Sequence, residues 1–192
     1  MFRLGAINDE LSPVFERTLD LAVALSIQEI EIHTVGCKVI EELETTEVRR
    51  VKQQLAQRQL HVCNISSTVF LQCHLDDRDE AIAWRMPFRS IKGCYADHLR
   101  GLERALEIAQ MLQAPLVRIF GFWQDKPLSD AIDEQVAGRL VRPLQMTRCC
   151  VRSLSNVAIS GVVCIETHHM GPDGAKESAQ SRVLYDPPLT TA

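Results

Sequence analysis

Two acidic residues, Glu166 and Asp186, stand at the ends of short apolar runs of the sequence. The first run is Gly161–Thr167 (GVVCIET), and the second is Arg182–Tyr185 (RVLY). If both runs are strands of a parallel sheet, the two acids lie at carboxyl ends of strands, where the chemistry of parallel α/β barrels collects. Carboxylate oxygens from two strands suit Mg²⁺ or Mn²⁺, and Zn²⁺ also fits if a histidine joins them. The simpler interpretations are a solvated strand-end acid for Glu166 and a turn-forming Asp-Pro for Asp186.

Three further polar residues also lie at or just after the ends of predicted strands. Glu31 and His33 lie on one face at the end of the alternating run Ile27–His33 (IQEIEIH). They are interpreted either as contacts to a substrate or as polar residues that fill the mouth of a barrel. His168 comes two residues after Glu166 and shares its face if the strand continues. It is a candidate contact for substrate or metal, or an ordinary loop histidine.

Arg118 stands inside the apolar run Pro115–Trp123 (PLVRIFGFW), where a buried positive charge needs a partner. That partner is either the phosphate of a sugar phosphate or an inward-facing carboxylate. His74, in the loop Cys73–Asp77 (CHLDD), is expected either over the substrate or on a surface loop. His98 opens a predicted helix and is expected to cap it or to pack there.

The elements that position these residues alternate between short apolar strands and longer amphipathic helices. Such alternation predicts βα units and a parallel sheet. Because no glycine-rich dinucleotide or phosphate-loop fingerprint occurs, a barrel is favoured over a doubly wound sheet. We predict six strands of the (β/α) TIM-barrel type, at 2–7, 27–33, 60–67, 115–123, 161–167 and 182–185, with helices near 13–26, after a cap at Thr45-Thr46, around 99–109 and at 133–154.

Composition excludes several classes of function. The 192 residues have 46% hydrophobic and 24% charged content, and the net charge is −4 with 21 basic and 25 acidic residues well mixed. That balance gives no electrostatic footprint for nucleic acid or for an anionic membrane. No apolar run reaches membrane-spanning length, and seven cysteines without CxxC spacing suggest a reduced, cytoplasmic protein.

Three long stretches carry a family resemblance, and two short motifs extend it. The stretches are Asn8–Leu43 (NDELSPVFERTLDLAVALSIQEIEIHTVGCKVIEEL), Glu44–Asp77 and His98–Trp123 (HLRGLERALEIAQMLQAPLVRIFGFW). The motifs are Ile165–His168 (IETH) and Leu184–Pro187 (LYDP). Together they resemble bacterial sugar phosphate isomerase/epimerase proteins of the xylose-isomerase-like TIM-barrel superfamily.

The resemblance implies a divalent metal at the carboxyl mouth of the barrel, held by carboxylates and a histidine. Carried over by position, Glu166 is a metal ligand and the catalytic base, and Asp186 is a second ligand. Glu31, His33, His74, Arg118 and His168 become candidate substrate contacts. The implied reaction moves a proton between adjacent carbons of a sugar, sugar phosphate or polyol.

The chain is expected to form a single barrel domain, 1–192, truncated at its carboxyl end, since a complete barrel needs about 250 residues. Strands seven and eight, with their metal ligands, would then be missing. Two exposed sheet edges make self-association into a homo-oligomer plausible. The alternative function is a catalytically inactive remnant of the barrel. A minor alternative, abasic-site endonuclease activity, would need a histidine-rich metal cluster and a basic surface, and neither is visible.

Overall fold

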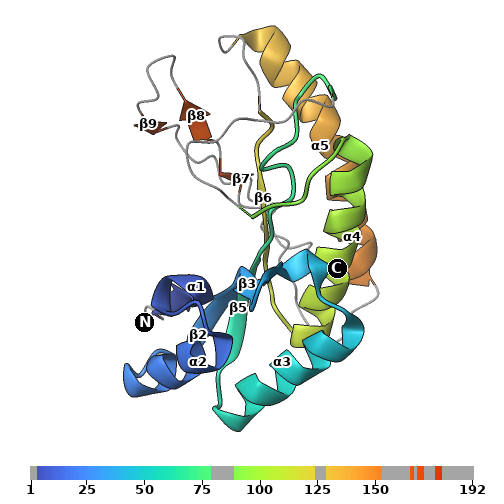
Figure 1. Cartoon of the computed structure of the whole chain (residues 1–192). Helices are drawn as coiled ribbons and strands as arrows, with labels where there is room; N and C mark the ends of the chain where they lie inside the picture. The colour runs from blue at the N-terminus through green and yellow to red at the C-terminus, as the bar shows by residue number, and fades with distance from the viewer. Residues whose placement is uncertain are drawn as a thin grey trace, which may run out of the picture.

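A five-stranded parallel sheet, in the order β1-β2-β5-β6-β7, forms the centre of the molecule (Figure 1). The computed structural model describes residues 4–78, 89–123 and 129–152, and then only the backbone of three short strands. The sheet contains β1 (Gly5–Ile7), β2 (Glu29–Ile32), β5 (His61–Ser66), β6 (Val117–Phe120) and β7 (Ile165–Glu166). Five predicted strands are therefore confirmed, and the sixth, at 182–185, lies outside the described residues.

Each parallel pairing is reached through a helical crossover, as parallel strands require. The crossover helices are α2 (Phe15–Ala24), α3 (Thr45–Gln57), α4 (Tyr95–Leu112) and α5 (Asp130–Arg152). They lie along one side of the sheet, which does not close into a barrel within the described residues (Figure 1). The architecture is thus the predicted βα succession of an open barrel.

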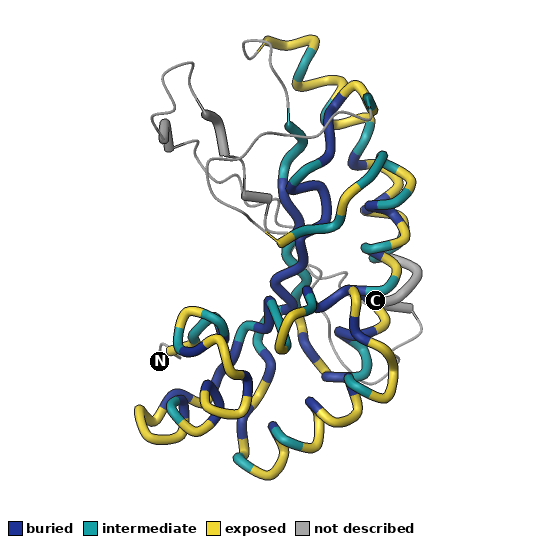
Figure 2. The backbone as a smooth tube through the Cα atoms, in the orientation of Figure 1, coloured by how far each residue is buried: buried dark blue, intermediate teal, exposed yellow. Residues whose placement is uncertain are grey.

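The core lies between the sheet and these helices (Figure 2). Ile30, Ile32 and Ile65 point from the strands to the helix side, where they are fully buried with Leu19 of α2 and Val48 of α3. A second cluster around Phe70, Leu102 and Ile119 packs α4 against β6 and the chain that follows β5. Strand side chains alternate in direction, so the residues between these isoleucines face the opposite side, which we call the concave face.

Two helix starts differ from the sequence prediction. Thr45 is the first residue of α3 rather than its cap; the cap is Glu44, paired with Glu47 in a reciprocal capping box. Helix α2 begins at Phe15, two residues later than expected, because the Ser12 hydroxyl accepts a hydrogen bond from the Val14 amide in a turn before the helix.

Several short elements were not predicted. Helix α1 (Asn8–Leu11) follows β1 directly, and a hairpin of β3 (Thr34–Val35) and β4 (Lys38–Val39) follows β2. The hairpin turns at Gly36, whose positive φ of 63° favours glycine. The hairpin leads into a 3-10 turn, η1 (Ile40–Glu42). Beyond β7, strands β8 (His168–Met170) and β9 (Lys176–Ser178) form a separate antiparallel pair.

His98 packs in the interior, as one of the two sequence interpretations had it. Its side chain is fully buried in α4, and its Nδ1 accepts a hydrogen bond of 2.9 Å from the Phe70 amide. Burial lowers the pKa of His98 from 6.5 to about 4, so the ring is neutral at pH 7.

We expect His98→Gln to flatten the acid side of the stability profile. The pKa of His98 is lower in the folded than in the unfolded state, so the unfolded state takes up the proton first as the pH falls. The free energy of unfolding is therefore at its full value above pH 6.5 and decreases as the pH falls toward 4. The loss reaches about 3 kcal/mol, since one pKa unit corresponds to about 1.4 kcal/mol. Urea unfolding between pH 4 and 7.5 measures it. His61→Gln, at an exposed position of β5, should keep the wild-type slope, and an equal change in both variants would contradict the assignment.

Candidate functional site at the strand ends

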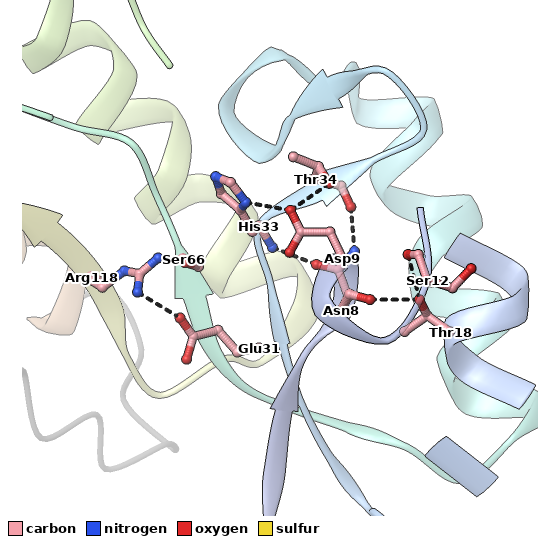
Figure 3. Close-up of polar contacts among 9 residues, drawn as sticks. All are labelled: Asn8, Asp9, Ser12, Thr18, Glu31, His33, Thr34, Ser66 and Arg118. Carbon is pink, nitrogen blue, oxygen red and sulfur yellow. Dashed lines mark hydrogen bonds and ion pairs between the residues drawn. The ribbon is translucent and has the colours of Figure 1, made fainter. Parts of the chain in front are cut away.

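Polar residues gather where the parallel strands end. Asn8 and Asp9 follow β1, His33 follows β2, and Ser66 ends β5 (Figure 3). Arg118 of β6 pairs in register with Ser66, and Glu166 of β7 pairs with Phe120. Carboxyl ends of parallel strands meet at one edge of a sheet, so these residues form one candidate site.

Asp9 and His33 form a close pair at this edge. The Asp9 Oδ2 lies 2.6 Å from the His33 Nδ1 and also accepts a hydrogen bond of 3.2 Å from the Thr34 hydroxyl (Figure 3). His33 is 9% exposed, so the pair is largely shielded from water. The hydrogen bond from His33 lowers the pKa of Asp9 below its usual value of 3.8, against the opposing effect of burial. Asp9 is therefore a carboxylate at neutral pH and orients the imidazole.

Asn8 fixes the geometry of that pair through the backbone. Its side-chain oxygen accepts a hydrogen bond of 2.7 Å from the His33 amide, and its side-chain nitrogen donates one of 2.6 Å to the Thr34 carbonyl. The Asn8 carbonyl in turn accepts a hydrogen bond of 2.7 Å from the buried Thr18 hydroxyl. The ends of β1 and β2 and helix α2 are thus joined by one buried network (Figure 3).

Glu31 and Arg118 form a second pair, on the concave face. The Arg118 Nη1 lies 3.5 Å from the Glu31 Oε1, and its Nη2 donates a hydrogen bond to the Ser66 hydroxyl (Figure 3). The guanidinium also lies 5.0 Å from the centroid of the Phe120 ring. Of the two partners considered for Arg118, the structure supplies the inward-facing carboxylate.

A buried carboxylate, Glu41, ties the hairpin region to the chain that follows β5. Its Oε1 accepts hydrogen bonds from the Thr68 amide and, at 3.3 Å, from the Thr68 hydroxyl. Burial raises the pKa of Glu41 above its usual 4.5, with the two Thr68 hydrogen bonds opposing this rise. No sequence pattern singled out Glu41, because its burial depends on the hairpin that places η1 against the sheet.

His74 lies in a buried segment rather than on the surface loop considered from the sequence. It is 7% exposed and forms a parallel bridge with Trp123, and its Nδ1 accepts a hydrogen bond of 3.3 Å from the Arg78 guanidinium. Main-chain hydrogen bonds on either side, from Leu75 to Trp123 and from Trp123 to Cys73, hold this segment beside the chain that follows β6. A contact with substrate stays a prediction.

Two thiols of the described chain, Cys63 and Cys73, are poor nucleophiles. Burial, helped by the charges of Glu31 and Glu29, raises the pKa of Cys63 to about 11. Burial also raises the pKa of Cys73 to about 12. Both thiols are therefore protonated at neutral pH.

The predicted metal ligands fall at or beyond the limit of the described side chains. Glu166 ends β7 as expected, and His168 begins β8, but only their backbone is described. Asp186 lies outside the described residues. Among the side chains that are described, no three of the His, Cys, Asp or Glu type come close enough to hold a metal ion. The metal site therefore stays a prediction.

Asn8 and Asp9 are the functional candidates that the sequence reasoning missed. They directly follow the first apolar strand, the same signal that singled out Glu166 at the fifth. Polar residues directly after an apolar run therefore could have identified Asn8 and Asp9 as candidates from the sequence. Ser66 could have been found in the same way, at the end of the third predicted strand.

Comparisons with known proteins support the fold at a coarse level. No protein-family model and no curated protein matches the chain. The structure of an uncharacterised protein from Parabacteroides distasonis ATCC 8503 is similar with a TM-score of 0.48 and 10% identity, over 87% of this chain and 53% of that one. No described helix of the present chain is both long and apolar enough to cross a membrane.

The fold and the polar strand ends define an α/β protein of the parallel-barrel type. One solved structure similar to it is that of D-psicose 3-epimerase in the presence of D-fructose, with a TM-score of 0.52 and 12% identity over 91% of this chain and 54% of that chain. At this identity the likeness establishes the fold alone. The chain spans about half the length of both structures.

We expect Asp9→Asn to destabilise the protein by roughly 1–3 kcal/mol at pH 7, because a charge-assisted hydrogen bond to buried His33 is lost. Chemical denaturation measures the change. Asp20→Asn is the matched control, since Asp20 forms an exposed ion pair with Arg58, a type worth at most about 1 kcal/mol. Equal losses in the two variants would show that the Asp9–His33 pair has no special weight.

Proposed function

We propose that this protein is a metal-dependent isomerase or epimerase of a sugar, sugar phosphate or polyol. The observation that carries the proposal is the row of polar side chains at the strand ends, with Glu31 and Arg118 facing the concave side. The fold shared with D-psicose 3-epimerase supports it at the level of architecture. A fold alone hosts many activities, so the proposal rests on the site.

The residues offer the interactions that a polyhydroxylated substrate needs. The Glu31 carboxylate accepts hydrogen bonds from hydroxyl groups, and the Arg118 guanidinium donates them. His33, oriented by Asp9, presents an imidazole at the neighbouring strand end. Proton transfer between adjacent carbons is proposed for the carboxylate of Glu166, which would act as general base and then return the proton on the other carbon.

A divalent metal, Mn²⁺ or Mg²⁺ with Zn²⁺ as a further option, completes the proposal, with Glu166 and Asp186 as ligands. When bound, such an ion stabilises negative charge that develops on the oxygens of the substrate. The donors named are hard oxygens, which favour Mn²⁺ and Mg²⁺.

The test follows solvent deuterium into the substrate. The purified protein is incubated in D₂O with Mn²⁺ and a panel of ketoses and aldoses, and proton NMR records exchange at the carbons beside the carbonyl. We expect exchange with at least one substrate, and its loss by about 100-fold or more in Glu166→Gln, the range that general-base catalysis supplies. Glu103→Gln, which removes an exposed carboxylate of α4, should retain the activity.

Metal binding is tested independently of turnover. Thermal melting with and without millimolar Mn²⁺ should show stabilisation in the wild type that Glu166→Gln reduces, because a ligand that binds only the folded state raises its stability. The absence of both exchange and stabilisation would reject the enzyme assignment in favour of an inactive barrel remnant.

A further inference from the structure

The concave face carries a guanidinium whose charge is already matched. Along β6, Val117 and Ile119 pack on the helix side, so Arg118 between them faces the concave side. Its side chain is 18% exposed, and that of its ion-pair partner Glu31 is 20% exposed. The two opposite charges thus lie side by side on a face that is only partly open to solvent.

Two further carboxylates lie near this side of the sheet. Glu29 lies two residues before Glu31 on the same face of β2 and is 9% exposed. Burial, and after it the charges of Glu31 and Glu29, raise the pKa of the nearby Cys63 thiol. Asp9, ionised through its bond to His33, adds a carboxylate at the edge.

We propose that Glu31 is a specificity-determining residue, which selects a neutral polyol or sugar and rejects its phosphorylated form. This inference rests on the proposed function for the identity of the substrate. A phosphate dianion at Arg118 would have to displace the Glu31 carboxylate or lie against it, so repulsion opposes it. A hydroxyl group can instead donate to Glu31 and accept from Arg118 without any change in charge.

Phosphate titration tests the inference without turnover. Inorganic phosphate is titrated into the wild type, Glu31→Gln and Glu103→Gln by calorimetry at pH 7.5 and constant ionic strength. We expect Glu31→Gln to bind phosphate at least about tenfold more tightly than the wild type, because one opposing charge is removed a few ångströms from the guanidinium. Glu103→Gln changes the net charge equally and should gain nothing. The double variant Glu31→Gln/Arg118→Gln should lose the gain.

Several results would overturn the inference. One is wild-type binding of phosphate as tight as that of Glu31→Gln, and another is a folded Glu31→Gln, judged by circular dichroism, that gains no binding. Glu31→Ala gives a second charge-removing variant if the glutamine variant does not fold. In the deuterium assay, equal wild-type exchange with D-fructose and D-fructose 6-phosphate would refute the selectivity and leave the proposed activity intact. Tighter phosphate binding by Glu31→Gln, with neither exchange nor stabilisation by Mn²⁺, would support the charge assignment and refute the activity.

Discussion

The site depends on the strict alternation of side chains along β2. Ile30 and Ile32 must point to the helix side, because the core that holds α2 and α3 to the sheet is built on them. Glu29, Glu31 and His33 are thereby turned to the opposite face, where they are largely shielded from water. Shielded ionisable groups need partners, so other strands of the sheet must supply them. Asp9 after β1 and Arg118 of β6 do so, at 2.6 and 3.5 Å.

The two pairs that result have different characters. Asp9–His33 is embedded in the network of Asn8, Thr18 and Thr34, which contacts both main chain and side chains, so its geometry is fixed by the fold. Glu31–Arg118 is longer, and it is supported by the Ser66 hydroxyl and the Phe120 ring. A pair of this second kind can exchange part of its interaction for contacts with a ligand. The first pair is therefore suited to hold an imidazole in place, and the second to bind.

The periodicity of the sequence was sufficient to predict five strands of the sheet and the helices that connect them, because both kinds of element depend on local patterns. The alternation in IQEIEIH placed Glu31 and His33 on one face, and the apolar run around Arg118 already required a partner for its charge. The identity of that partner was not predictable, since Glu31 and Arg118 meet only when β5 lies between their strands. The burial of Glu41 and of His74 likewise depends on contacts distant in sequence, with Thr68 and Trp123. Asn8 and Asp9, in contrast, could have been predicted, because they directly follow the first apolar run of the sequence.

Stability alone gives a weak reason to keep Glu31 and Arg118. Removing two charges from water costs several kcal/mol per ion, and replacing such a pair with apolar residues is often neutral or stabilising by about 1–4 kcal/mol. Leu or Ile at both positions would continue the apolar character of the strands. A pair on the concave face that stability does not explain is accounted for, under the proposed function, by what it binds. Under the proposal made above, the matched charges of Glu31 and Arg118 favour hydroxyl groups over a phosphate.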